Sequence, residues 1–394
     1  MSAASREDCE SLDAADPLAP LRERFTIPAG LIYLDGNSLG LMPRAVAGRA
    51  DAVLGEWSAR LIRGWMEEGW WDLPLRVGAK IAPLIGTAAE QVVVCDTTTT
   101  NLYKTLTAAV RLRPERRVVV IQDSSFPTDV YVAESVARQM DGEFRVLKSG
   151  EPLEAALDGG VAAAVMNHVD FRTAEIADMA AATRAIHDAG ALALWDLSHS
   201  AGVLPVRLEE CGVDFAVGCT YKYLNGGPGS PAYLYAAARH LADSAQPIPG
   251  WMGHADPFLM ENEYRASAGI RRFLTGTQPI ISMSILDAAL DAYDRVDLAA
   301  VRAKSVALTS RFIELVDERL GLEVLSPRDP ERRGSQVSLR HPEAAAVHDK
   351  LMGAGLQGDV RSADILRFGF NPLYVSFADV WDAVEILAAV LGEA

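Results

Sequence analysis

Short apolar runs alternate with helix-length amphipathic segments between about residues 90 and 235. The apolar runs are 91–96, 118–123, 144–147, 161–167, 191–196, 214–219 and 232–236. They are apolar nearly throughout rather than alternating, which is typical of strands covered on both faces. Amphipathic segments such as 128–140 and 176–190 lie between them. This order predicts an α/β fold with a mostly parallel central sheet flanked by helices, whose ligands lie at the carboxyl ends of the strands.

The C-terminal part of the chain has a different pattern. A long helical pattern from about Ile280 to Leu320 precedes short strand-like runs at 323–327, 335–340 and 364–370, with a helix-like segment at 343–355. This pattern predicts a smaller α+β C-terminal lobe joined through a long helix. We therefore expect three parts. Residues 1–50 are an N-terminal segment that packs with the small lobe. Residues 51–285 are a large ligand-binding domain, and residues 286–394 are a small C-terminal domain.

Charge and cysteine content narrow the class of protein. The formal net charge is −16, with no basic patch of the kind that neutralises nucleic-acid phosphates. The four cysteines include no CxxC pair, so we expect neither a metal site nor disulfides, and a reducing cytoplasmic location. The N-terminus lacks the apolar core of a signal peptide, and no uncharged apolar stretch reaches about 18 residues. We expect no membrane span and no nucleic-acid partner.

Two strand ends carry a carboxylate and an amine. Asp196 follows the apolar run 191–195, and Lys222 lies between two tyrosines before the glycine loop NGGPG. A carboxylate can keep a pyridine nitrogen protonated, and a lysine amine can attack an aldehyde. Taken alone, Asp196 is better explained as a cap, and Lys222 as a solvated surface residue.

Two further strand ends complete the pattern. The threonines of TTTTN, 97–101, precede a helix-like stretch, where hydroxyls and free N–H groups form an anion site suited to phosphate. Phe126 follows another strand and could stack on an aromatic ring, although a core position would explain it alone. A phosphate site, a stacking ring, an acid and a lysine in this order predict a pocket for pyridoxal 5'-phosphate.

Several segments resemble the kynureninase family, pyridoxal-phosphate hydrolases of the fold type I, aspartate-aminotransferase-like superfamily. The matching segments span nearly the whole chain: IYLDGNSLGLMP, TTTTNLYK, SSFPTDVY, WDLSHSAGVLPV, GCTYKYLNGGPG, GWMGH, FLTGTQPI and RFGFNPLY. The most specific are YLDGNSLG, FPTD and YKYLNGGPG. The lysine and aspartate alone would not separate this family from the cysteine desulfurases.

The resemblance implies roles for individual residues. Lys222 would hold the cofactor covalently, Asp196 would pair with its ring nitrogen, and Phe126 would stack on its ring. The other implied cofactor contacts are Thr98, Thr99, Asp129, Asn167, His199 and Tyr221, with Trp251 and Thr277 reaching the phosphate from the neighbouring subunit of a homodimer. Arg367 would pair with the substrate carboxylate, since its planar fork matches a carboxylate. Trp65, Gly276 and Thr277 would surround the substrate aryl ring.

The implied activity is hydrolysis of L-kynurenine, or of its 3-hydroxy form, to anthranilate or 3-hydroxyanthranilate and L-alanine. Lys222 would shuttle the α-proton, Asp196 would support the electron sink, and Tyr221 would serve later proton transfers. These reactions belong to tryptophan catabolism and NAD biosynthesis. A desulfurase or aminotransferase is the alternative enzyme, but a desulfurase needs a mobile cysteine and none follows Cys219. The third hypothesis is a non-catalytic pyridoxal-phosphate-binding protein. The presence of Lys222, Asp196 and Arg367 together argues against it.

Overall fold

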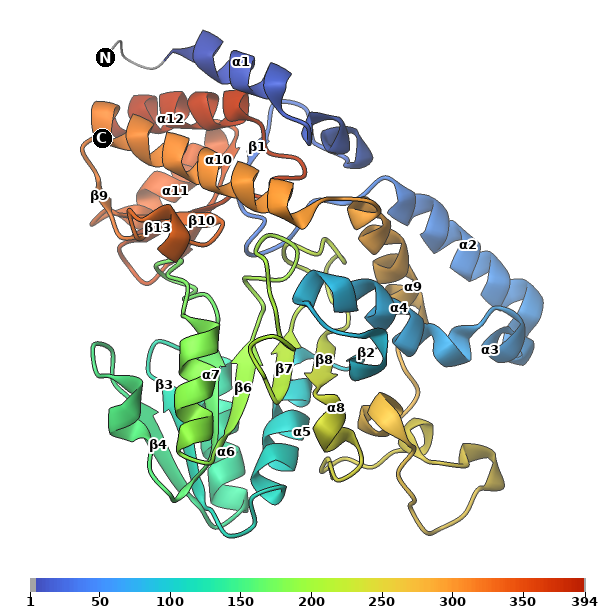
Figure 1. Cartoon of the computed structure of the whole chain (residues 1–394). Coiled ribbons are helices and arrows are strands. Elements are labelled where there is room, and N and C mark those ends of the chain that lie inside the picture. The colour runs from blue at the N-terminus through green and yellow to red at the C-terminus, as the bar shows by residue number, and fades with distance from the viewer. Residues whose placement is uncertain (1–4, 393–394) are drawn as a thin grey trace.

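The central sheet has seven strands in the order β2-β8-β7-β6-β5-β3-β4, in a computed structural model that describes residues 5–392 (Figure 1). All neighbouring strands are parallel except β8, which is antiparallel to both β2 and β7. The strands are β2 (Val92–Val94), β3 (Val118–Gln122), β4 (Glu143–Leu147), β5 (Val161–Asn167), β6 (Leu192–Asp196), β7 (Phe215–Gly218) and β8 (Tyr233–Ala236). Each overlaps one of the predicted apolar runs, and only β4 begins outside its run, by one residue, which confirms the predicted sheet.

Helices cover both faces of this sheet. In β6, Leu192 and Leu194 pack in one apolar cluster with α5 (Thr98–Arg111) and α6 (Pro127–Gln139). Ala193 and Trp195 of the same strand belong to the cluster on the other face, with α4 (Leu73–Ile81) and α7 (Met179–Asp188). Since successive strand side chains point to opposite faces, burial of both faces explains why the runs are apolar throughout.

The C-terminal lobe contains a four-stranded antiparallel sheet in the order β12-β13-β10-β9. The predicted strand runs of this part correspond to β9 (Glu323–Val324), β10 (Gln336–Arg340) and β13 (Ile365–Gly369), whereas β12 (Asp359–Arg361) was not predicted. Three helices accompany the sheet: α10 (Leu298–Arg319), α11 (Ala344–Gly353) and α12 (Phe377–Gly392). The lobe is therefore α+β, as the sequence predicts.

The expected long helix at 280–320 is two helices. The first, α9 (Ile280–Ala289), passes into a short 3-10 turn, and the chain then takes a left-handed conformation at Arg295, with φ of 57°. The second, α10, restarts at Asp297, whose carboxylate accepts a hydrogen bond from the N–H of Ala299 at 2.9 Å. This N-cap supplies the helix start that a purely apolar pattern does not reveal.

The N-terminal segment lies against the C-terminal lobe, as Figure 1 shows for α1 (Arg6–Ala15) beside α12. Both Asp13 carboxylate oxygens accept backbone N–H groups at the start of α12. The strand β1 (Ile32–Tyr33) pairs in parallel with β11 (Leu356–Gln357). This pairing brings the turn at 35–40 between the lobe and the carboxyl ends of the central strands. The chain then continues into α2 (Ala45–Arg60) and α3 (Gly64–Glu67).

One short helix, α8 (Ala238–Leu241), follows the central sheet and leads into the irregular segment 242–279. Across residues 5–392, none of the helices combines the length and the hydropathy that crossing a bilayer would require.

Candidate active site

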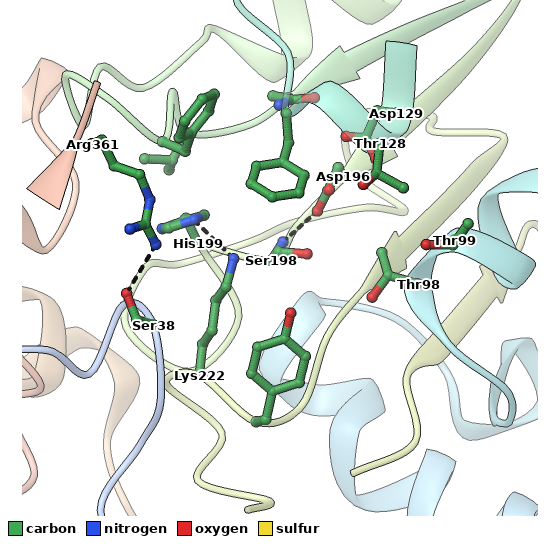
Figure 2. Close-up of a pocket in the computed structure, with 15 residues that line it drawn as sticks. Ser38, Thr98, Thr99, Thr128, Asp129, Asp196, Ser198, His199, Lys222 and Arg361 are labelled. Atoms are coloured by element: carbon green, nitrogen blue, oxygen red, sulfur yellow. Dashed lines mark hydrogen bonds between the residues drawn. The ribbon is translucent and has the colours of Figure 1, made fainter. Parts of the chain in front are cut away.

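A cavity of about 260 Å³ opens where the central strands end, between the large sheet and the C-terminal lobe (Figure 2). Nine of the residues predicted from the sequence line it, and they are Thr98, Thr99, Phe126, Asp129, Asn167, Asp196, His199, Tyr221 and Lys222. The remaining wall comes from Ser38, Thr128, Val169, Phe171, Ser198 and Arg361. Asn167 and Asp196 end neighbouring parallel strands and are register partners, which explains why distant sequence positions meet here.

Lys222 extends from a tightly packed turn into the cavity. Its carbonyl accepts the Asn225 N–H at 2.9 Å, and the carbonyl of Tyr221 accepts the Gly40 N–H at 2.8 Å. A Cβ on Gly40 would lie 2.3 Å from the Lys222 carbonyl oxygen, so this approach requires glycine. The N-terminal segment thus fixes the backbone of the lysine.

Lys222 Nζ donates a hydrogen bond to His199 Nε2 at 2.9 Å. Burial, and then the charge of Lys222, lower the pKa of His199 well below its usual value. The imidazole is therefore neutral and able to accept this bond. The amine of Lys222 and a neutral imidazole are therefore in direct contact inside the cavity.

Asp196 and Asp129 form a second pair of titratable groups. Asp196 accepts the Ser198 N–H at 2.6 Å. Asp129 is 2% exposed, and burial followed by the charge of Asp196 raises its pKa well above the ordinary value. The neutral form of Asp129 is thus favoured beside Asp196.

The start of α5 forms an anion site at one side of the cavity. Thr97 caps this helix by accepting the Thr100 N–H at 3.3 Å. Thr98 and Thr99 occupy the first turn, where backbone N–H groups have no acceptor within the helix. Tyr221 lies nearby, and Cys219 together with burial raises the pKa of its phenol, which therefore stays protonated as a donor.

The turn before this helix is held by a buried cation. Asp96 has a left-handed backbone with φ of 47°, and its carboxylate accepts the Lys104 ammonium at 2.7 Å. Lys104 Nζ also donates to the Phe273 carbonyl at 2.8 Å, and the Thr275 hydroxyl donates to Asp96 at 3.1 Å. These bonds connect the anion site to the segment that contains Gly276 and Thr277.

Phe126 supplies an aromatic face to the cavity. It immediately precedes α6, its side chain is 41% exposed, and its ring meets Phe171 edge-on with centroids 5.4 Å apart. An exposed aromatic ring that lines a cavity is suited to stack on a flat ligand.

Three buried polar atoms of the wall have no hydrogen-bond partner within residues 5–392. They are Asp129 Oδ2, Asn167 Oδ1 and His199 Nδ1. Unsatisfied buried polar atoms are costly, and several in one cavity indicate a polar ligand. The residues of this cavity fit pyridoxal 5'-phosphate. They include a lysine for its aldehyde, a carboxylate for its ring nitrogen, an aromatic ring to stack on it and a helix N-terminus for its phosphate.

Arg367 does not reach the cavity wall. Its side chain is 1% exposed and binds the Asp359 carboxylate through Nε at 2.7 Å and Nη2 at 2.5 Å. Its Nη1 donates to the Phe171 carbonyl. The arginine on the wall is Arg361, at the other end of β12. Arg367, which is expected to pair with the substrate carboxylate, is thus paired with Asp359, which opposes it in the register of β12 and β13.

Trp65, Trp251, Gly276 and Thr277 also lie outside this cavity. Trp251 Nε1 donates to the Thr277 hydroxyl at 3.3 Å. Trp65 and Thr277 line a separate apolar groove. The other groove residues are Val53, Trp57, Leu61, Ile62, Trp70, Gln278, Ile280 and Ile281.

Sequence reasoning missed six wall residues. Three of them, Ser38, Thr128 and Ser198, lie within quoted motifs, in YLDGNSLG, FPTD and WDLSHSAG, so the motifs contained the signal. The other three are Val169, Phe171 and Arg361, which lie in no motif and depend on the tertiary arrangement.

Comparison with known proteins agrees with this site. A family described as the kynureninase C-terminal domain matches residues 301–387. Kynureninase of Burkholderia mallei (strain SAVP1) is 49% identical over 397 residues, covering 98% of this chain and 95% of that protein. Kynureninase of Pseudomonas fluorescens is 48% identical with the same coverage.

Solved structures show the same fold at low sequence identity. The cysteine desulfurase CsdA of Escherichia coli has a TM-score of 0.80 at 17% identity, covering 95% of this chain and 98% of that one. A C-DES mutant with glycine covalently linked to its PLP cofactor has a TM-score of 0.80 at 16% identity, covering 93% and 98%.

The fold is the one that these fold type I enzymes share, and the cavity has the groups that pyridoxal 5'-phosphate needs. Within that class the sequence similarity is specific, because it extends over nearly the whole length of both chains. The chain belongs to the kynureninase family, and it is a hydrolase that acts on a carbon–carbon bond.

Proposed function

We propose that this protein converts L-kynurenine and water to anthranilate and L-alanine, with the residues of the described cavity in the roles below. The contact between Lys222 Nζ and His199 Nε2 at 2.9 Å carries this proposal. It gives the cavity an amine that can hold the cofactor and a neutral base beside it. The 3-hydroxy form of the substrate is a second candidate for the same site.

The chain would hold pyridoxal 5'-phosphate through groups on opposite sides of the cavity. Lys222 would attach it covalently, and Asp196 would hold its ring nitrogen. The N–H groups and hydroxyls of Thr98 and Thr99, with the Tyr221 phenol, would bind its phosphate. Phe126 would cover its ring, while Asp129, Asn167 and His199 supply further polar contacts. When bound, the cofactor supplies the electron sink for cleavage of bonds at the substrate.

Three side chains would take part in proton transfer. Lys222 Nζ would take the proton from the substrate α-carbon, and His199 Nε2 would orient that amine. The protonated Tyr221 hydroxyl would donate in the later steps. In the overall reaction, the hydroxyl of water joins the γ-carbonyl carbon, the Cβ–Cγ bond breaks, and a proton is delivered to Cβ. Asp196 would keep the ring nitrogen protonated throughout.

A homodimer would complete the site. The segment containing Trp251, Gly276 and Thr277 lies outside the cavity of its own chain, next to an exposed apolar groove. Within that groove Trp57 is 56% exposed and Ile62 is 79% exposed, which favours burial against another chain. In the proposed dimer, Trp251 and Thr277 reach the phosphate of the neighbouring subunit, and Trp65, Gly276 and Thr277 approach its substrate ring.

The proposed domain division follows the two sheets. Residues 51–285 form the cofactor-binding domain, residues 286–394 form the small domain, and residues 1–50 pack with the latter. The pairing of β1 with β11 supports this assignment of the N-terminal segment. We also propose a cytoplasmic location, which is supported by the four free cysteines.

Anthranilate fluorescence tests the activity directly. Purified protein with pyridoxal phosphate is incubated with L-kynurenine and, separately, with the 3-hydroxy form. Wild type should release the aromatic product, and Lys222→Ala should lose both turnover and the absorption band of the attached cofactor. Absence of anthranilate from a wild-type protein that retains its cofactor band would overturn the assignment. Sedimentation of the same samples tests the dimer.

A further inference from the structure

Lys104, on the second turn of α5, is a lysine whose side chain is completely buried, at 0% exposed. Its ammonium has three partners, which are the Asp96 carboxylate at 2.7 Å, the Phe273 carbonyl at 2.8 Å and the Cys95 sulfur at 3.3 Å. These partners use all three donors of the ammonium. Lys104 has no part in the reaction proposed for the cavity.

A buried ion pair of this kind adds little stability by itself. Removal of the two charges from water is costly, and well-packed apolar residues of similar volume are often at least as stabilising. The neighbouring positions Leu102 and Leu106 of the same helix are apolar and fully buried. An apolar side chain at position 104 would therefore suit this core, and the lysine is better explained by what its ammonium holds in place.

The ammonium of Lys104 holds Asp96 in an uncommon backbone conformation. With φ of 47°, Asp96 lies in the left-handed region that residues other than glycine rarely adopt. Such a conformation persists where the surrounding contacts over-determine it. The Asp96 carboxylate also accepts the Thr275 hydroxyl at 3.1 Å, and the Asp96 carbonyl accepts the Ala232 N–H at 2.9 Å. Three separate parts of the chain thus fix this one residue.

The conformation of Asp96 determines how the chain enters the anion site. Asp96 directly precedes Thr97, the N-cap of α5, and Thr98 and Thr99 follow in the first turn and line the cavity (Figure 2). A change of φ and ψ at Asp96 would rotate this first turn and its free N–H groups away from their present direction. The buried lysine therefore acts on the orientation of the anion site.

A second buried side chain holds the same turn from the other end. Asn101 is 0% exposed, and its Nδ2 donates to the Cys95 carbonyl at 2.8 Å. Asn101 and Lys104 are one turn apart on the same face of α5. Together they attach the helix to the end of β2, so the turn between strand and helix is closed on both sides.

The charge of Lys104 also matters for an anion. The Asp96 side chain is 20% exposed and stands two residues before Thr98, where an unpaired carboxylate would oppose a phosphate. The ammonium at 2.7 Å makes the pair neutral. The N–H groups at the start of α5 can then attract the phosphate without opposition from Asp96.

We propose that Lys104 is a positioning residue for the cofactor phosphate, which holds Asp96 in the conformation that directs the first turn of α5 at the phosphate. The inference rests on the proposed function, because it takes that first turn to be the phosphate site. Lys104 acts through Asp96 and does not contact the cofactor. Its bond to the Phe273 carbonyl fixes the same turn relative to the segment that contains Gly276 and Thr277.

The experiment separates the phosphate site from the rest of the cavity. Apo-protein is titrated with pyridoxal 5'-phosphate and, separately, with pyridoxal, and the absorption band of the attached ligand gives both dissociation constants. Pyridoxal has the aldehyde and the ring but no phosphate, so the ratio of the two constants reports on the phosphate site alone. Thermal unfolding of the same samples identifies the folded variants.

Three variants and one control are compared with wild type. Lys104→Met removes the ammonium, and Lys104→Met combined with Asp96→Asn leaves no buried charge without a partner. Thr275→Val removes one hydrogen bond to Asp96 and keeps the ion pair. Lys304→Met is the matched control, because Lys304 is also buried, with its side chain 7% exposed, and pairs with Asp16 at 2.6 Å outside the cavity wall.

Lys104→Met should raise the dissociation constant of pyridoxal 5'-phosphate about 10- to 100-fold, since the phosphate meets a displaced turn and an unpaired carboxylate. Its constant for pyridoxal should stay within about threefold of wild type, because Lys222 and the ring contacts are unchanged. The double variant should show a smaller rise of about 5- to 10-fold, and Thr275→Val one of about two- to fivefold. Lys304→Met should unfold at a lower temperature with the ratio of wild type.

A wild-type ratio of the two constants in folded Lys104→Met would overturn the role, and so would an equal loss of affinity for both ligands. If Lys104→Met does not fold, the double variant decides, and a wild-type ratio there overturns the role. If neither lysine variant folds, Thr275→Val decides in the same way.

Failure of this inference is distinguishable from failure of the proposed function. If wild type binds pyridoxal as tightly as pyridoxal 5'-phosphate, the phosphate site at α5 falls, and the inference with it. If wild type prefers the phosphate form but yields no anthranilate, the proposed reaction falls and the role of Lys104 stands. If wild type does both and Lys104→Met keeps the wild-type ratio, only the role of Lys104 falls.

Discussion

His199 Nε2 accepts a hydrogen bond from Lys222 Nζ at 2.9 Å, and this contact lies inside the cavity. A buried, neutral imidazole beside the amine fixes the direction of the lysine side chain. It can do so at any pH near neutrality, because the pKa of His199 lies well below its usual value.

The first prediction concerns this contact. His199→Phe should lower kcat about 10- to 100-fold, since it removes a hydrogen bond to a charged group that must be oriented. His199→Gln keeps an acceptor and should retain more activity. Steady-state rates across pH 5.5 to 8 test whether His199 is neutral throughout. A histidine that is already neutral adds no inflection to the pH–rate curve near its ordinary pKa of about 6.5. A wild-type inflection there that vanishes in His199→Gln would contradict it.

A second prediction separates the two buried aspartates. Burial, and then Asp196, raise the pKa of Asp129 well above its usual value, so Asp129→Asn, which mimics the neutral carboxyl, should keep its cofactor affinity within about threefold of wild type. Asp196→Asn removes the charge that would hold the ring nitrogen protonated, and should lower kcat about 100-fold or more. Titration of apo-protein with pyridoxal phosphate, together with turnover, distinguishes the two. Equal losses in both variants would show that both carboxyl groups are charged.

The third prediction links substrate binding to Asp35. Burial, and then the charge of Asp359, raise the pKa of Asp35 to about 7. Below that pH the carboxyl is neutral, and Arg361, Arg367 and Asp359 together carry a net positive charge. Above it Asp35 adds a negative charge, which opposes an anionic substrate. KM for L-kynurenine should therefore rise as pH increases through about 7.

Asp35→Asn provides the control for this pH effect. The amide cannot ionise, so its KM should stay low and flat across the same pH range. An unchanged rise in Asp35→Asn would assign the effect to another group.

The fourth prediction concerns stability, at a site remote from the cavity. Asp214 is 2% exposed in its side chain and accepts bonds from His187, His240 and Arg239, as well as from the Ala193 N–H. These partners hold the pKa of Asp214 below its usual value. Asp214→Asn should lower the free energy of unfolding by about 1–3 kcal/mol, because it removes the charged acceptor of these hydrogen bonds, while the partners themselves are partly exposed.

The sign of the pH dependence follows from the direction of that shift. A carboxyl whose folded pKa is lowered stabilises the fold above its unfolded pKa of about 3.9, and this stability is lost as pH falls through the folded value. Wild type should therefore lose more stability than Asp214→Asn on acidification below about pH 4. Denaturant unfolding at pH 7 and at about pH 2.5 measures both quantities, and identical losses would contradict the assignment.

The strand-end residues could be predicted because the sheet itself could. Lys222, Asp196 and Phe126 follow apolar runs that are buried on both faces, and parallel strands bring such positions to one edge. The polar wall of the cofactor cavity therefore follows from local pattern and from the family motifs.

Arg361 could not be predicted in the same way. It lies on β12, a strand of three residues that has no apolar run of its own. Its placement depends on pairing with β13 and on the approach of Ser38 from far along the chain. The same register gives Arg367 its partner in Asp359, which motif matching alone does not show. The break between α9 and α10 was missed because Asp297, a polar cap, interrupts a pattern read from apolar spacing.

The two sides of the cavity are completed at different stages of synthesis. The side with Thr98, Asp196 and Lys222 is built from residues between 98 and 222, whereas Ser38 and Arg361, on the other side, are 323 residues apart. On the ribosome, the large sheet can form while the C-terminal lobe is still untranslated. A nascent chain should thus assemble the side of the cavity that carries Lys222 before Ser38 and Arg361 can meet.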